Sequence, residues 1–160
     1  MDKQTIITTL FLGILPISEL RGAIPFAYFS GLSLPFSLLL GLCANLFVSP
    51  IAYIFLSYFH RFFYKYWPFY AKTFNKTVLR VRHKLGDKVN KYGMWGVLLF
   101  VGIPLPVTGA WTGTLGAWVL GLDRKHSIIA VSGGVLLAGA IIAILLLLGT
   151  GFGSIFLKLV

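Results

Sequence analysis

Acidic residues and cysteine are scarce in this chain. Only four of its 160 residues are Asp or Glu, against 14 Lys or Arg, and one is Cys. A single cysteine excludes a disulfide or a cysteine metal site within one chain. The sequence also lacks a Ser-His-Asp set, a phosphate-binding loop and a carboxylate pair, and its histidines have no metal-site spacing. We therefore expect no enzyme activity, no cofactor and no metal.

Charged residues of either sign are few, and apolar residues dominate. Only 11% of the residues are charged while 58% are hydrophobic, and the mean hydropathy is +0.88. This composition excludes a soluble domain with an ordinary polar surface. It is typical of an integral membrane protein, which we expect to be all-α.

The positive charge is concentrated in one connection, where Asp87 is the only acid. Beside membrane segments, such a cluster indicates a cytoplasmic loop near anionic lipid rather than a nucleic-acid surface. The basic residues of this connection are Arg61, Lys65, Lys72, Lys76, Arg80, Arg82, Lys84, Lys88 and Lys91.

Part of this connection has the pattern of an amphipathic helix. Apolar residues recur at spacings of three and four from Tyr70 to Val89, beside a separate basic ridge. We expect the helix to lie on the inner leaflet, either as a lipid-binding surface or as a solvated face that only sets topology. The ridge consists of Lys72, Lys76, Arg80, Lys84 and Lys88.

The apolar segments have two lengths. The segment 5–18 has 14 residues and would be about 21 Å long as a helix, against about 30 Å of hydrocarbon. Short segments joined by a proline-containing tip predict re-entrant hairpins over 5–32 and 95–122, if they are not four distorted full spans. The segments 34–58, with a kink at Pro50, and 127–149 are long enough to be transmembrane helices.

The two halves of the chain repeat at an offset of ninety positions. Pro16 then matches Pro106, and Ser18 matches Thr108. We expect a first repeat over 1–59, a basic cytoplasmic connection over 60–92 and a second repeat over 93–160. Because each repeat holds one hairpin and one span, the second is inverted relative to the first.

The first tip, Leu15–Pro25, carries the charges Glu19 and Arg21 in otherwise apolar sequence. They are the only charged residues between Lys3 and Arg61. A charge at membrane depth costs about 2.5 to 3.5 kcal/mol and is tolerated where it faces a cavity or a partner. The two charges therefore indicate a functional site, unless the tip lies outside the membrane or they pair only to hold the fold.

Half-helices beginning near Gly22 and Gly109 would point the positive ends of their dipoles at the midplane. With Arg21, these ends favour an anionic group such as a phosphate or carboxylate. Glu19 could take up a proton, which proton-coupled exchange requires. We expect a substrate site formed by Ser18, Glu19, Arg21, Asn45, Thr108, Trp111 and Thr112.

Both tip motifs, Leu15–Pro25 and Ile103–Gly113, resemble the signatures of the small multidrug export protein family. The resemblance covers nearly the whole chain and implies an exporter in the cytoplasmic membrane of a bacterium or archaeon. The paired hairpins are also similar, more distantly, to those of the DedA family. That likeness implies translocation of the lipid carrier undecaprenyl phosphate.

We therefore expect a transporter of an amphipathic, anionic substrate such as undecaprenyl phosphate, with proton coupling through Glu19. Export of cationic amphipathic drugs is one alternative, in which Glu19 is the binding charge. Another is a non-transporting scaffold that recruits lipid or a partner through the basic helix. Because two polar tips need shielding from lipid, we also expect a homo-oligomer.

Overall fold

The computed structural model describes residues 3–79, 92–105 and 108–157, and every regular element in these ranges is helical. Within these ranges, two helices are long and apolar enough to cross a membrane, Leu34–Tyr66 and Arg124–Gly149. Their most apolar windows have mean hydropathies of 2.0 and 2.7, and only 33% of each is buried inside the protein. Apolar side chains that face outward over such lengths suit lipid, which supports the expected membrane class.

The first hairpin consists of α1 (Lys3–Ile14) and α2 (Glu19–Phe29). Their 12 and 11 residues give lengths of about 18 and 17 Å, well short of the hydrocarbon thickness of about 30 Å. Pro16 lies in the turn between them, where its missing amide interrupts no helix. The segment predicted as a hairpin over 5–32 is thus two short helices, while its re-entry into a membrane stays a prediction.

The first long helix is broken at one residue. α3 (Leu34–Leu46) and α4 (Val48–Tyr66) are separated by Phe47. The kink predicted at Pro50 therefore lies three residues earlier, at Phe47. A proline breaks the helix before its own position, because it cannot donate an amide hydrogen bond and its ring displaces the carbonyl four residues before it.

α4 also continues to Tyr66, beyond the predicted end at residue 58. Aromatic rings on successive turns stabilise this extension, because side chains four residues apart face each other on a helix. The ring centroids of Phe55 and Phe59 are 5.4 Å apart, and those of Phe59 and Phe63 are 4.3 Å apart.

The second hairpin joins the helix Tyr92–Gly102 to α7 (Ala110–Leu120). α8 (Arg124–Leu157) follows and is longer than the predicted span 127–149 at both ends. Its glycine-rich last turns contain no proline that would end a helix earlier.

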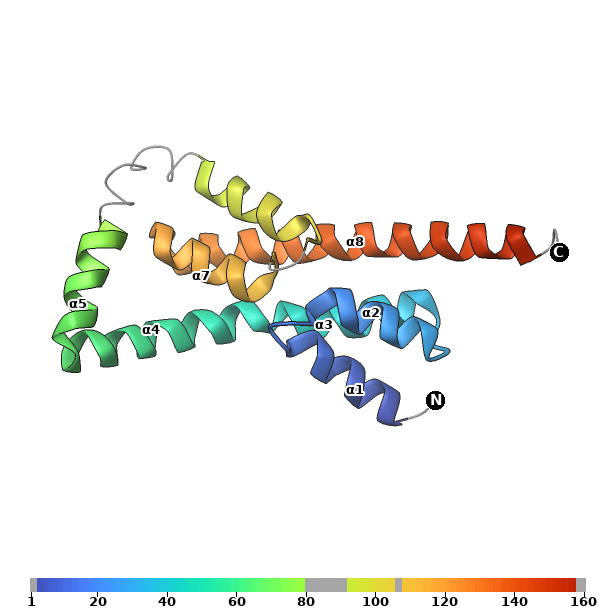
Figure 1. The fold of residues 1–160 in the computed structure, drawn as a ribbon, viewed down its shortest axis with the longest axis horizontal. Coiled ribbons are helices and arrows are strands. Elements are labelled where there is room, and N and C mark those ends of the chain that lie inside the picture. The colour runs from blue at the N-terminus through green and yellow to red at the C-terminus, as the bar shows by residue number, and fades with distance from the viewer. Residues whose placement is uncertain (1–2, 80–91, 106–107, 158–160) are drawn as a thin grey trace.

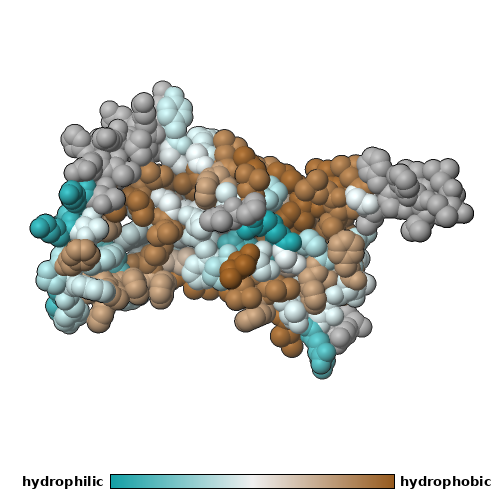
Figure 2. Space-filling model, in the orientation of Figure 1, coloured by the Kyte–Doolittle hydropathy of each residue, from teal (hydrophilic) through white to brown (hydrophobic). Residues whose placement is uncertain are grey.

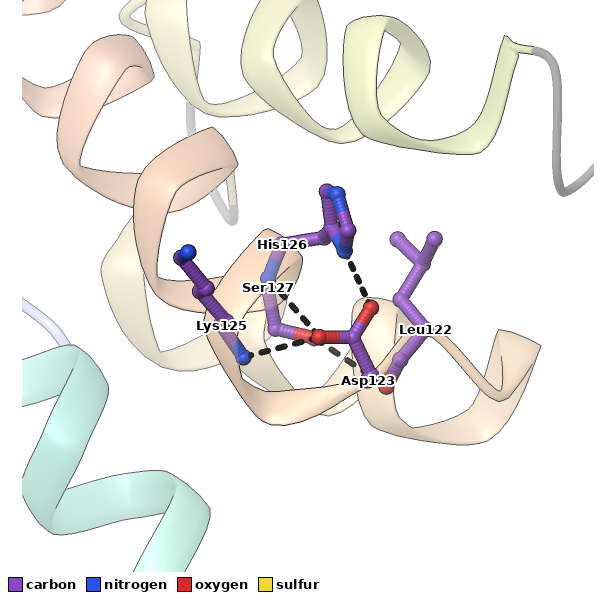
Figure 3. Close-up of polar contacts among 5 residues, drawn as sticks. All are labelled: Leu122, Asp123, Lys125, His126 and Ser127. Carbon is purple, nitrogen blue, oxygen red and sulfur yellow. Dashed lines mark hydrogen bonds and ion pairs between the residues drawn. The ribbon is translucent and has the colours of Figure 1, made fainter.

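Asp123 explains the early start of α8 (Figure 3). Its carboxylate accepts hydrogen bonds from the amides of Lys125 at 3.2 Å and His126 at 3.3 Å. These are two of the first amides of α8, which have no partner inside the helix. The His126 ring also hydrogen-bonds this carboxylate, which lowers the pKa of Asp123 below its ordinary value of 3.8. His126 is therefore part of a helix cap.

The connection between the halves begins with α5 (Pro68–Phe74) and the π-helical turn η1 (Asn75–Leu79). Lys72 and Lys76 of the predicted basic ridge are exposed on these two elements. The other members of the ridge, Arg80, Lys84 and Lys88, lie outside the described residues.

The two hairpins approach each other from opposite ends of the molecule, and their tips meet near its middle (Figure 1). The helix formed by α3 and α4 and the helix α8 run along the length of this pair. α1, α2 and α3 pack together at one end, whereas α4, α7 and α8 pack together at the other. An inverted repeat predicts such opposed hairpins, and the symmetry itself stays a prediction.

Small residues fill the space where these helices cross. Ala23, Ala27, Ala110, Ala117 and Ala130 are each 0% exposed. Small side chains at crossings allow close helix approach, as in membrane proteins. Figure 2 shows a mostly hydrophobic face, with hydrophilic atoms at the end where α5 lies and a smaller hydrophilic strip near the middle. The middle strip is thus flanked by hydrophobic surface on this face.

Candidate functional site

The site is centred on the contact between Glu19 and the beginning of α7. Glu19 is the first residue of α2 and is only 4% exposed. Its Oε2 accepts a hydrogen bond from the amide of Ala110, and its Oε1 accepts one from the amide of Trp111, each at 3.2 Å. Because the first amides of a helix have no partner within it and its dipole is positive there, the carboxylate occupies an anion-binding position. We call this contact the tip clasp.

Gly109 makes room for the carboxylate. A Cβ atom at this position would lie 1.5 Å from Oε2 of Glu19, so no larger residue fits without moving the acid. At the repeat offset of ninety, Gly109 is also the counterpart of Glu19 in the sequence. Equivalent positions of the two tips therefore meet, one supplying a charge and the other the space for it. The sequence predicted a helix start near Gly109 and gave no signal that a carboxylate would lie against it.

The backbone of Glu19 is strained. Its φ is 48°, and among the described residues it is the one non-glycine with a positive φ. The left-handed region costs such a residue of order 1 to 3 kcal/mol, and strain of this kind is common at binding and switching sites. The surrounding contacts, including the tip clasp, offset that cost.

Arg21 reaches the opposite tip as well. Its guanidinium, which is half-buried, donates a hydrogen bond to the carbonyl of Leu105. Glu19 and Arg21 do not form a salt bridge with each other, since the one ion pair within the described residues joins Asp123 and His126. Both charges instead bind backbone groups of the second tip. Their contacts hold the two tips together in this conformation.

Trp111 and Asn45 secure the end of α1. The indole Nε1 of Trp111 donates to the carbonyl of Ile14 at 2.8 Å, and Nδ2 of Asn45 donates to the carbonyl of Gly13 at 2.9 Å. Carbonyls in the last turn of a helix lack internal partners, so both side chains satisfy groups that would otherwise be unpaired in an apolar environment. Asn45, predicted as part of the substrate site, is 1% exposed and acts as a tie between α3 and α1.

The predicted hydroxyl groups bind within their own tips. Thr108 Oγ1 donates to the carbonyl of Ile103 at 2.6 Å and accepts from the amide of Leu105 at 3.0 Å. Thr112 Oγ1 accepts a hydrogen bond from the amide of Gly109 at 3.1 Å. Ser18 is half-buried in the turn before Glu19. The bonds of Thr108 and Thr112 thus help to shape the second tip.

One buried pair of hydroxyl groups was not predicted from the sequence. Thr114 Oγ1 on α7 donates to the carbonyl of Ala110 at 2.6 Å and accepts a hydrogen bond from the hydroxyl of Ser49 on α4 at 3.2 Å, and both side chains are almost fully buried. The pair ties the second hairpin to the first long helix. A threonine in an apolar helix gives no sequence signal for such a partner 65 positions away.

The space between the tips is very small. The cavity has a volume of about 10 Å³ and is lined by Glu19, Arg21, Asn45, Thr108 and Gly109 together with apolar residues of α8. Such a volume holds about one water molecule. The space between the tips therefore has no room for anything larger than water. No group of three or more His, Cys, Asp or Glu lies together in the part of the chain that the structure describes.

A family model described as "Putative small multi-drug export protein" matches residues 19–141, which include the first tip from Glu19 onward, the whole second tip and about half of α8. Searches of curated proteins and of solved structures found no match.

Proposed function

Because this chain belongs to the small multi-drug export protein family, we propose that it transports an amphipathic substrate, with the space between its two tips as the binding site. The observation that carries the proposal is the tip clasp. A membrane chain poor in charge buries one carboxylate at a helix N-terminus, beside a cavity and a guanidinium. Ionisable groups at membrane depth mark substrate or proton pathways.

The donors of the site fit an anionic head group. The amides of Ala110 and Trp111 already hold one anion, the carboxylate of Glu19. If Glu19 swung away, these amides and the guanidinium of Arg21 would present donors to a phosphate or carboxylate of similar size. The resident carboxylate is thus an internal competitor for the substrate head.

Protonation of Glu19 supplies a way to open the clasp. A neutral carboxyl group makes weaker hydrogen bonds to the two amides than a carboxylate does, since bonds to an ionised acceptor are roughly twice as strong. Two anions cannot share the small space between the tips at low cost, so binding of an anionic head favours proton uptake by Glu19. By linkage, protonation would strengthen anion binding by the same factor. Proton and substrate would then move together.

A lipid phosphate such as undecaprenyl phosphate is the substrate that we favour. Its head suits the donors of the clasp, and its chain could remain in the bilayer beside the exposed apolar faces of the hairpins. The distant likeness to the DedA family supports the same substrate class.

Export of amphipathic cations is the second candidate. The family description names drug export, and Glu19 is a buried carboxylate to which a cation could bind. In this case the substrate would compete with the two amides for Glu19, and Arg21 would have to move aside.

Transport in vesicles distinguishes these functions. Purified protein is reconstituted with a pH gradient, and transbilayer movement is measured for a labelled polyprenyl phosphate and for a cationic dye. We expect movement of the phosphate in the wild type and its loss in Glu19→Gln. Asp123→Asn, which removes a carboxylate far from the tips and keeps a capping residue, should transport normally.

Each other outcome contradicts the favoured substrate. Movement of the dye alone, lost in Glu19→Gln, would replace the anionic substrate with a cationic one. If neither probe moved, transport of both substrates would be excluded, and the role of a non-transporting scaffold would be favoured.

A further inference from the structure

A second cavity lies at the C-terminal end of α4. This end of the helix is far from the two tips (Figure 1). Its volume is about 460 Å³, which is ample for a lipid head group and very different from the closed space at the tip clasp. One face of α4 and one residue of α7 line this cavity, which we call the α4 bowl. The lining residues are Ser57, His60, Arg61, Tyr64, Lys65 and Trp118.

An aromatic cluster fixes the wall of the α4 bowl. The ring centroid of His60 lies 4.3 Å from that of Phe74 and 5.0 Å from that of Trp118. Nδ1 of His60 also hydrogen-bonds the hydroxyl of Tyr70 at 3.1 Å. These contacts join α4, α5 and α7 around one imidazole. The bowl is consequently formed before any ligand arrives, which lowers the entropic cost of binding.

Two cations face the bowl. Arg61 and Lys65 are four residues apart on α4 and so lie on the same side of the helix. Neither forms a salt bridge with a carboxylate in the described ranges. The Nζ of Lys65 lies 5.2 Å from the ring centroid of Tyr66. Within the described residues, no carboxylate therefore neutralises the positive charge of Arg61 and Lys65.

The bowl lies in a belt of exposed aromatic rings. Tyr58 is 71% exposed, Phe62 58%, Tyr66 65% and Trp67 54%. Aromatic side chains gather at the level of lipid head groups, where one part of the ring is apolar and another is hydrated. The α4 bowl therefore opens at head-group depth, on the side that the basic residues predict to be cytoplasmic.

We infer that the α4 bowl binds a phosphate group, carried on the head of a membrane lipid. The guanidinium of Arg61 supplies a planar fork of donors that matches phosphate oxygens, and Lys65 adds a second positive charge. The hydroxyl of Tyr64 is hydrogen-bonded to the side chain of Asn75, which holds the Tyr64 ring in the wall of the bowl. The site thus combines two positive charges with an aromatic wall. The inference is independent of the proposed transport, because no residue of the tip clasp takes part.

Native mass spectrometry of the full chain tests the inference. The protein is mixed with phosphatidic acid, whose head is a bare phosphate, and with phosphatidylcholine of the same acyl chains. We expect selective retention of phosphatidic acid and at least about tenfold weaker binding in Arg61→Gln/Lys65→Gln, because charge-assisted hydrogen bonds are lost. Arg61→Lys/Lys65→Arg, which keeps both charges, should retain most of the affinity and shows that the α4 bowl survives substitution.

Arg124→Gln/Lys125→Gln is the matched control, since it removes one arginine and one lysine that are exposed outside the bowl. Equal losses of phosphatidic acid binding in this variant and in the bowl variant would overturn the inference, because non-specific attraction between anionic lipid and any basic residue would explain both. Lack of selectivity for phosphatidic acid would overturn it too. Inorganic phosphate tests the source: if it binds as tightly as the lipid, the site takes free phosphate and the lipid assignment is wrong.

Discussion

Gly109→Ala should open the tip clasp. The added Cβ would lie 1.5 Å from Oε2 of Glu19 and 2.4 Å from its Cδ. Ordinary contacts between such atoms are about 3.5 to 4.0 Å, so the carboxyl group must shift by about 2 Å. A shift of that size breaks its hydrogen bonds to the amides of Ala110 and Trp111, which are each 3.2 Å long.

The expected cost follows from those two bonds. A hydrogen bond to a charged group contributes about 1.5 to 3 kcal/mol, and a buried charge that loses its partners costs about 3 to 5 kcal/mol. Both figures describe the same loss, so we expect the free energy of unfolding to fall by about 3 to 5 kcal/mol. At about 2 to 4 °C per kcal/mol, the melting temperature in detergent should fall by about 6 to 20 °C.

Gly116→Ala is the matched control, because it lies on the same helix and its added Cβ would meet nothing within 4 Å. Alanine is the better helix former, so this variant should be stabilised by up to about 1 kcal/mol. A double-mutant cycle completes the test. In a Glu19→Ala background, Gly109→Ala should cost far less, since no carboxylate remains to be displaced. An equal cost in both backgrounds would refute the reasoning.

Three further predictions concern other polar contacts. Asn45→Leu removes the donor to the Gly13 carbonyl and should cost about 1 to 3 kcal/mol in thermal unfolding; an unchanged melting temperature would refute this role. Arg21→Gln weakens a link to the second tip, so hydrogen exchange at residues 103–105 should accelerate, and unaltered rates would contradict the link. His126 lowers the pKa of Asp123 in the folded protein, so the ionised carboxylate should stabilise the fold above pH 3.8 and lose this effect as the pH falls through the lowered pKa. In thermal unfolding, Asp123→Asn should therefore be less stable than the wild type above pH 3.8 and equally stable in acid. A difference in stability that persists in acid would contradict this role.

Segment lengths were readable from the sequence because they depend on local composition. Two proline-containing tips between short apolar segments predicted hairpins, and the helices α1, α2 and α7 lie where those segments are. The helix ends were less predictable. α8 begins at Arg124 because Asp123 caps it, and α4 continues through an aromatic run whose side chains stack on each other.

The charges of the first tip were also identified from the sequence, but their partners were not. The acceptor role of Glu19 depends on amides 91 and 92 positions away, and backbone groups leave no trace in a residue pattern. Asn45 likewise binds a carbonyl 32 positions earlier. The sequence indicated where polar groups stand, whereas tertiary packing decided that they tie the tips together.

The central claim is that an anionic substrate displaces Glu19 from α7 and drives its protonation. Infrared difference spectroscopy tests this most directly, because the chain has only four acidic residues and Glu19→Gln identifies the signal. Adding polyprenyl phosphate at constant neutral pH should convert a carboxylate band into a carboxylic acid band in the wild type and not in Glu19→Gln. Binding of the lipid without any carboxyl signal would contradict the account.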